Sequence, residues 1–181
     1  MTRGQLDHAI RAVCDLIGDD AVYVFGSQAV LGEYPDAPAT LRQSMELHVA
    51  PVNRMNRLDQ INGVMGQDSL FHRTHGFYVE GLPITEEKLP AGWRSRAHVV
   101  SGPATRENRG ICVQAHDLAA SKLVTLRDVD REFVGVLLAE RLISAAVLLE
   151  RLTALEIDNV LRERLRQWVT ITAAGLAAVR T

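Results

Sequence analysis

The chain has 181 residues, of which 47% are hydrophobic, and a formal net charge of −2 at pH 7. This length and apolar content are enough to bury one core, and they fall within the size range of a single domain. A net charge so close to zero excludes a global basic field, so any contact with RNA has to come from a local patch.

The two cysteines and the N-terminal residues bear on the cellular compartment. Cys14 falls in a predicted helix and Cys112 in a predicted strand, which argues against a disulfide framework and against a zinc cluster. Residues 1–8 lack the apolar centre of a signal peptide, and no apolar run approaches the length of a membrane span. The sequence therefore predicts a cytoplasmic protein with no membrane partner.

The first two thirds of the chain alternate between helical and strand patterns. Apolar residues at helical spacing from Leu6 onward predict a helix that Gly18 closes. A strand over 21–25, a short helix over 26–31 and a proline-containing loop over 34–39 follow. The next expected elements are a strand over 45–50, a helix over 56–65, a helical turn or two within 68–75, and strands over 77–79, 97–100 and 111–114.

From His116 onward the pattern is helical almost to the end. The expected helices cover 116–127, 130–140, 144–155 and 157–179. A mixed sheet flanked by helices and followed by a helical C-terminal part predicts an α/β or α+β fold. We expect residues 1–115 to form the α/β core and residues 116–181 to pack on it as part of a single compact unit.

One predicted strand presents two side chains that can bind a metal. Alternate residues of a strand point to the same face, so Ser44, Glu46 and His48 share one face, while Met45, Leu47 and Val49 enter the core. Glu46 and His48 could then hold a divalent metal that neutralises charge in nucleotidyl or phosphoryl transfer. The alternative interpretation is the solvated face of a half-buried sheet.

The turn that follows the strand over 21–25 offers a place for phosphate. Gly26 lacks the Cβ that blocks close backbone approach, and Ser27 supplies a hydroxyl where the strand passes into a helix. Free N–H groups at the start of a helix suit an anion such as a triphosphate. The same two residues are also typical of an ordinary turn.

Five motifs together resemble a bacterial nucleotidyltransferase-like family related to the toxins of the AbiE and MenAT toxin-antitoxin systems. The resemblance spans about Val22 to Ile143. The motifs are Gly26-Ser27-Gln28, Ser44-x-Glu46, Phe71-His72-x-Thr74-x-Gly76, Leu89-Pro90-x-Gly92-Trp93 and His116-Asp117-Leu118-x-x-Ser121-Lys122-Leu123.

The resemblance implies a DNA polymerase β-like nucleotidyltransferase fold and an activity. The expected reaction transfers a nucleotide, with a pyrimidine NTP favoured, to the acceptor end of tRNA with the help of Mg²⁺ or Mn²⁺. Such an enzyme would block translation as the toxin of a toxin-antitoxin system, and a cognate antitoxin protein would restrain it.

The resemblance also implies roles for single residues. Gly26 and Ser27 match the nucleotide-phosphate position, and Glu46 matches the first metal-binding acid. Lys122 matches a lysine that contacts the triphosphate, although a lysine on a helix is ordinarily a solvated surface residue. Asp130 matches a catalytic acid that follows this lysine, and its alternative role is to cap the next helix.

His48 departs from the family pattern, which has an acid at this position. Magnesium prefers hard oxygen ligands over imidazole, whereas manganese tolerates a histidine. The sequence therefore leaves open a second function, a degenerate nucleotidyltransferase fold that binds nucleotide or a partner protein without catalysis.

Three weaker candidates also have two interpretations each. His72 and His75 share a helix face if the segment is helical, and such a pair without further ligands is usually structural. Trp93 either fills the core or stacks a base. The arginines near the end of the chain form either a solvated helix face or a patch for the tRNA backbone; they are Arg151, Arg162, Arg164 and Arg166.

Overall fold

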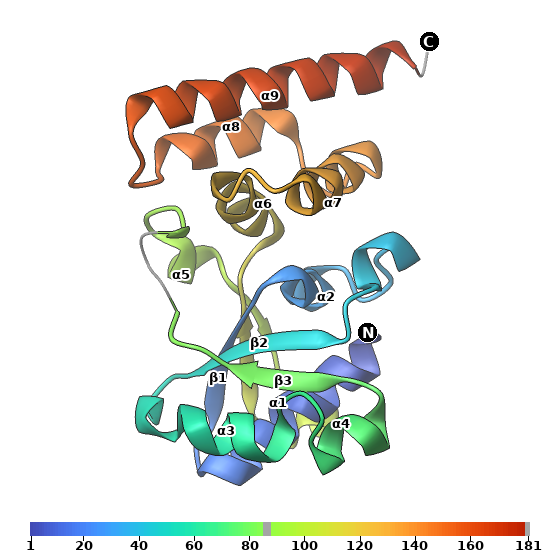
Figure 1. Ribbon diagram of the computed structural model, residues 1–181, viewed down its shortest axis with the longest axis vertical. Coiled ribbons are helices and arrows are strands. Elements are labelled where there is room, and N and C mark those ends of the chain that lie inside the picture. The colour runs from blue at the N-terminus through green and yellow to red at the C-terminus, as the bar shows by residue number, and fades with distance from the viewer. Residues whose placement is uncertain (85–87, 180–181) are drawn as a thin grey trace. The chain divides into compact units, whose positions relative to one another are not determined.

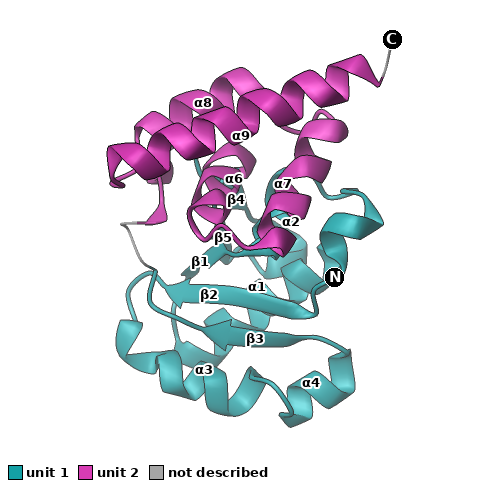
Figure 2. Cartoon of the chain, turned by 45° about the horizontal axis from the view of Figure 1, so that its top comes forward, with its two compact units in different colours: residues 1–84, 96–114 teal, residues 85–95, 115–181 magenta. Residues whose placement is uncertain are grey.

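The computed structural model describes residues 1–84 and 88–179, and the chain divides into two compact units (Figure 2). Unit 1 consists of Met1–Ile84 and Arg96–Gln114, and unit 2 of Thr85–Ser95 and Ala115–Thr181. The sequence-based division at 115/116 differs from this one by the segment 85–95 and by Ala115, which belong to unit 2. Within that unit, the Ala91 N–H donates to the Ala154 carbonyl at 2.8 Å.

Unit 1 is built on a five-stranded mixed sheet in the order β3-β2-β1-β5-β4, of which Figure 1 labels β1, β2 and β3 and Figure 2 labels all five strands. β1 is antiparallel to β2 and parallel to β5, β2 is parallel to β3, and β4 is antiparallel to β5. The bounds are β1 Ala21–Phe25, β2 Glu46–Pro51, β3 Tyr78–Gly81, β4 His98–Val100 and β5 Arg109–Cys112. The predicted mixed sheet with helices and a helical C-terminal part is confirmed.

One face of this sheet is covered by helices α1 (Arg3–Ile17) and α3 (Leu58–Met65). A capping box between Thr2 and Gln5 begins α1, and Gly18 in the left-handed conformation ends it, as its position in the sequence predicts. The alternating strand residues that face these helices are fully buried, among them Val22, Val24, Leu47, Val49 and Val79. Met45 was wrongly expected in this core; it precedes β2 and is 54% exposed.

β5, the last strand in chain order, begins two residues earlier than expected. Parallel pairing aligns Ala21 with Arg109 and Val24 with Cys112, so β5 ends before Gln114. Gly110 lies within this strand because Ile10 of α1 occupies the space of a Cβ, with its Cδ1 2.3 Å from the Cβ position. A larger residue at 110 would displace Ile10 from the core.

Shorter helical segments connect the strands of unit 1. The predicted helix over 26–31 is divided into a 3₁₀ turn and a single α-turn, and the helix expected over 56–65 begins with a 3₁₀ turn. These segments are η1 Ser27–Ala29, α2 Val30–Glu33, η2 Ala39–Arg42, η3 Met55–Arg57, α4 Leu70–His75 and η5 Pro103–Thr105.

Both cysteines of the chain, Cys14 and Cys112, are free and buried. Burial is the largest cause of the shift in each case, and it raises the pKa of each thiol to about 12.

Unit 2 is helical, with a core formed by leucines and valines from all four of its long helices. They are α6 Ala115–Val124, α7 Asp128–Ala139, α8 Ala145–Thr153 and α9 Asn159–Ala178, and the short α5 (Trp93–Arg96) precedes β4. Ser144 caps α8 and Asp158 caps α9 through side-chain hydrogen bonds. Within residues 1–84 and 88–179, no helix combines the length and apolar character that a membrane crossing needs.

Candidate functional site

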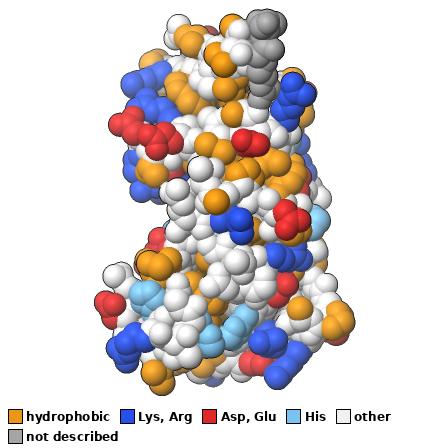
Figure 3. Space-filling model, turned by 90° about the vertical axis from the view of Figure 1, so that its right-hand side faces the viewer, with side chains coloured by type: hydrophobic (Ala, Val, Ile, Leu, Met, Phe, Trp, Pro, Cys, Tyr) orange, Lys and Arg blue, Asp and Glu red, His pale blue; other side chains and the backbone are white. Residues whose placement is uncertain are grey.

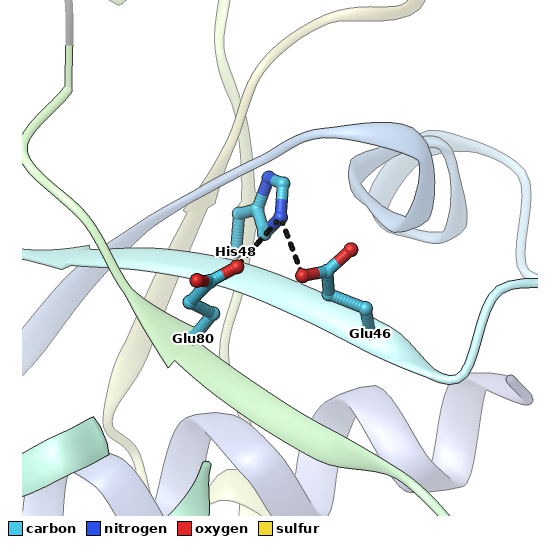
Figure 4. Close-up of side chains that lie close together, drawn as sticks. All are labelled: Glu46, His48 and Glu80. Carbon is cyan, nitrogen blue, oxygen red and sulfur yellow. Dashed lines mark ion pairs between the residues drawn. The ribbon is translucent and has the colours of Figure 1, made fainter. Parts of the chain in front are cut away.

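One face of β2 and β3 brings two carboxylates and an imidazole together, those of Glu46, Glu80 and His48 (Figure 4), and Tyr78 lies beside Glu46 on the same face. Parallel pairing sets Glu46 beside Tyr78 and His48 beside Glu80. Because side chains alternate along each strand, all four project from the same face, opposite the buried Leu47 and Val79. The predicted side-by-side placement of Glu46 and His48 is confirmed.

The imidazole of His48 lies between two carboxylates. Its Nε2 is 3.2 Å from Oε1 of Glu46 and 3.4 Å from Oε2 of Glu80. The side chains are 28%, 34% and 41% exposed for His48, Glu46 and Glu80, so solvent and ligands can reach them. One potential ligand atom from each residue lies within 4.8 Å of the other two. Two carboxylates and an imidazole that converge in this way form a ligand set for a divalent cation.

Glu46 and Glu80 shift each other's pKa through a hydrogen bond between their carboxyl groups. A hydrogen bond with Glu46, followed by burial, raises the pKa of Glu80. Burial also acts to raise the pKa of Glu46, but hydrogen bonds and the charge of His48 outweigh it and lower that pKa. Burial and the nearby charge of Glu46 raise the pKa of Tyr78, which hydrogen-bonds Glu46. A cation between Glu46 and Glu80 would relieve the repulsion that the shared hydrogen bond now reduces.

Gly26 is required by the position of His48. Its φ is +69°, and a Cβ built on it would lie 2.8 Å from Nδ1 of His48. Pairing of β1 with β2 sets Phe25 opposite His48 and so holds the turn against the imidazole. The structure therefore gives Gly26 a role that the sequence did not predict, room for the His48 ring, and the predicted phosphate contact stays a prediction.

Ser27 begins the 3₁₀ turn η1 at the end of β1, as the strand-to-helix pattern predicts. The helical segments behind it, η1 and α2, are three and four residues long. Ser44 precedes β2, and its Oγ accepts the Glu46 N–H at 3.1 Å, which helps to fix the start of that strand.

Lys122 and Asp130 form a buried ion pair in unit 2. The Lys122 Nζ donates to Asp130 Oδ1 at 2.8 Å, and the two side chains are 13% and 3% exposed. Thr125 Oγ1 and Arg127 Nε donate to Oδ2 at 2.6 and 2.7 Å, and Lys122 Nζ lies 4.9 Å from the centre of the Phe133 ring. Lys122 is therefore not an ordinary solvated lysine. The capping alternative for Asp130 is wrong, because Arg127 is the N-cap residue of α7.

No family model, curated protein or solved structure matches the chain. An assignment of function therefore depends on the chemistry of its own residues.

Sequence reasoning missed Glu80 and Tyr78. The signal was present in the alternation Tyr78-Val79-Glu80, which puts a phenol and a carboxylate on one face of a strand, but the predicted strand over 77–79 ended one residue before Glu80, whereas β3 continues to Gly81. The parallel pairing of β3 with β2 was not deducible from that alternation. Without it, Glu80 is one more exposed acid.

The remaining histidine candidates have packing roles. His75 lies against His8, with ring centres 4.5 Å apart, and against Phe71. The Nδ1 of His72 accepts the Asp68 N–H at 3.0 Å. His72 and His75 thus have different partners, as the structural interpretation expects. Histidine side chains, pale blue in Figure 3, lie at several separate places on the face shown.

Trp93 and two of the C-terminal arginines are also engaged internally. Trp93 is 2% exposed, so its ring is buried rather than open to a base. Arg151 pairs with the fully buried Asp117 at 3.3 Å. Arg162 donates to the carbonyls that end α8 and the following loop, those of Leu152, Leu155 and Ile157. Arg151 and Arg162 are therefore not part of a freely solvated helix face.

Replacing Gly26 by alanine is expected to weaken Mn²⁺ binding and to destabilise the protein by more than the same change at Gly76. Both glycines have a positive φ, +69° and +70°, which costs an alanine about 1 to 2 kcal/mol. Only at Gly26 does the new Cβ meet a side chain; at Gly76 it has nothing within 4 Å. Thermal unfolding by circular dichroism and Mn²⁺ titration by electron paramagnetic resonance measure the two effects. Equal losses for Gly26→Ala and Gly76→Ala would contradict the contact with His48.

Proposed function

We propose that the protein is a metal-dependent nucleotidyltransferase and the toxin of a toxin-antitoxin system, which transfers nucleotides from an NTP to the acceptor end of tRNA and so blocks translation. The observation that carries the proposal is the convergence of Glu46, His48 and Glu80 on one point beside the Gly26 turn. The family resemblance of the sequence motifs supplies the substrate and the biological role.

Glu46, His48 and Glu80 would hold Mn²⁺ or Mg²⁺, with Mn²⁺ favoured by the imidazole. Such a cation supplies charge neutralisation for the phosphates of the NTP. In the transfer, the 3′-hydroxyl of the acceptor bonds to the α-phosphorus and pyrophosphate leaves. The proton of the 3′-hydroxyl is proposed to pass to solvent water, which reaches the cluster because Glu80 is 41% exposed.

The nucleotide is proposed to bind with its phosphates near Gly26 and Ser27, where the resemblance puts them. Lys122 is proposed to supply a positive charge for the triphosphate, and Asp130 to hold that ammonium in one orientation through their 2.8 Å contact. A pyrimidine NTP is the favoured donor. A cognate antitoxin protein is the proposed partner.

The decisive experiment incubates the protein with total tRNA, Mn²⁺ or Mg²⁺, and CTP, UTP, ATP or GTP radiolabelled at the α-phosphate. We expect the wild type to label tRNA with a pyrimidine nucleotide. Glu46→Gln is expected to reduce the rate by about 100-fold or more, since a metal centre contributes several kcal/mol to such a transition state. Lys122→Ala is expected to reduce it as well.

The matched control is Asp59→Asn, which removes an exposed acid of α3 in the same unit as Glu46. It should leave the rate unchanged. Equal labelling by wild type, Glu46→Gln and Lys122→Ala would defeat the proposal.

A specific observation favours the second candidate, a fold that binds nucleotide or a partner protein without turnover. The His48 Nε2 already lies 3.2 Å from Glu46 and 3.4 Å from Glu80, so these three side chains contact one another directly. Under this alternative the wild type labels nothing, while His48→Asp, which restores the family acid, creates activity. Labelling by the wild type excludes it.

A further inference from the structure

An apolar cavity of about 280 Å³ opens in unit 2 between α9 and the α6–α7 connection. It lies entirely within that unit, and no part of the proposed nucleotidyltransferase chemistry uses it. Its lining residues come from α6, the connection, α7 and α9; they are Leu123, Leu126, Arg131, Arg164, Leu165, Gln167, Trp168 and Ile171. The volume lies just below the range for drug-sized ligands, which begins at about 300 Å³, and so suits a smaller molecule.

The interior of this cavity is lined by apolar residues, two of which belong to the core of unit 2. Leu123 and Leu165 are each 1% exposed and belong to the core of unit 2. Trp168 is half-buried, and Ile171 is 63% exposed at the edge. An exposed isoleucine beside a half-buried indole leaves apolar surface that a ligand can cover.

The connection between α6 and α7 holds one lining residue in a strained conformation. Leu126 has φ +56°, a region that bulky residues rarely adopt and that costs about 1 to 2 kcal/mol. Its N–H donates to the Leu123 carbonyl at 3.2 Å, and the buried Asp130 anchors the following turn. Strain of this kind persists where the surrounding structure fixes it, and it is common at ligand-binding positions.

Two arginines give the cavity a positive edge. Arg131 is paired with the exposed Asp128 at 2.5 Å. Arg164 is exposed, and no ion pair or hydrogen bond of its side chain is found among the described residues. No acidic residue lines the cavity. The lining therefore combines an apolar interior with an unneutralised guanidinium at its edge.

We propose that this cavity binds a small anionic amphiphile, a molecule with an alkyl or aromatic body and a single acidic head group. The body would contact Leu126, Trp168 and Ile171, and the head would accept hydrogen bonds from Arg164. A partner helix is the alternative occupant; it would meet Arg164 without a matching single acidic head group, and the comparison of ligands below tests it.

Octanoate and octan-1-ol test this proposal, because they share an alkyl body and differ in the charge of the head group. Protein labelled with 5-fluorotryptophan gives two fluorine resonances, one from Trp168 in the cavity and one from the buried Trp93, which Trp93→Phe assigns. We expect octanoate below its micelle concentration to shift the Trp168 resonance saturably and to leave that of Trp93 in place. Octan-1-ol is expected to bind about tenfold more weakly, for lack of the charge-assisted bond.

Variants on α9 separate the two parts of the site. Arg164→Glu is expected to remove the advantage of octanoate over octan-1-ol, and Ile171→Glu to weaken both. Arg166→Glu, on the same helix but outside the lining, is the matched control and should change neither. The proposal is overturned if octanoate gives no saturable shift, if both resonances shift alike, if the two ligands bind equally, or if Arg166→Glu has the effect of Arg164→Glu.

Discussion

Replacing Asp130 by alanine is expected to destabilise unit 2 by about 3 to 5 kcal/mol, the usual loss when one member of a buried ion pair is removed. Asp130 is 2% exposed and accepts hydrogen bonds from Lys122, Thr125 and Arg127. Its loss leaves the Lys122 ammonium, 13% exposed, without its carboxylate partner. Urea unfolding followed by tryptophan fluorescence measures the change in unit 2 alone, because both tryptophans of the chain lie in that unit.

Asp128→Ala is the matched control for this substitution. Asp128 lies in the same first turn of α7, but its side chain is 87% exposed, so its pair with Arg131 contributes at most about 1 kcal/mol. If Asp130→Ala and Asp128→Ala unfold at the same urea concentration, Asp130 does not anchor the unit.

The same carboxyl group makes the stability of unit 2 depend on pH. Burial acts to raise the pKa of Asp130, but hydrogen bonds from Arg127, Lys122 and Thr125 outweigh it, and the net pKa is lowered. A lowered pKa in the folded state means that the stabilisation is present above the unfolded value of about 3.9 and is lost as pH falls through the folded value. Wild-type unit 2 should therefore lose stability over this acid range, and Asp130→Asn should lose less.

Replacing His48 by aspartate is expected to shift the cation preference of the cluster toward Mg²⁺. Aspartate supplies a third hard oxygen ligand in place of an imidazole nitrogen, and Mg²⁺ binds oxygen in preference to nitrogen. We expect the ratio of the Mg²⁺ to the Mn²⁺ dissociation constant to fall by about tenfold, the scale on which changes around a metal alter affinity. Mn²⁺ titration by electron paramagnetic resonance, with Mg²⁺ as competitor, measures both constants without requiring activity.

Two further variants make this measurement specific. His98→Asp adds an acid at an exposed position of β4 and should leave the ratio unchanged. Glu46→Gln should weaken the binding of both Mn²⁺ and Mg²⁺. If Mn²⁺ binds Glu46→Gln as tightly as wild type, the cation occupies some other part of the protein, and the metal centre proposed for Glu46, His48 and Glu80 is wrong.

Local patterns in the sequence were sufficient for most elements of the fold. The helix before Gly18 and the strand over 21–25 agree closely with α1 and β1, because a glycine C-cap and a short apolar run are strong local signals. The errors lie where pairing decides the bounds. β5 begins earlier than expected because its register with β1 is fixed by contacts from elsewhere in the chain, including Ile10 against Gly110.

The candidate site was predictable only in part. The two-residue spacing of Glu46 and His48 determines that they share a face of β2, since this follows from strand geometry alone. The third acid, Glu80, joins them only through the parallel pairing of β2 and β3. A sequence separation of 32 or more residues carries no local signal for such pairing.

The sequence by itself determined the fold class, the helical C-terminal part and the two adjacent metal-capable side chains, because periodicity and capping act over a few residues. Only the tertiary structure decided that Glu80 completes the cluster, that Gly26 makes room for the His48 ring, and that Asp130 holds Lys122 instead of capping a helix. Each of these depends on strand register or burial. Those properties arise when distant segments pack together, and no stretch of the chain specifies them alone.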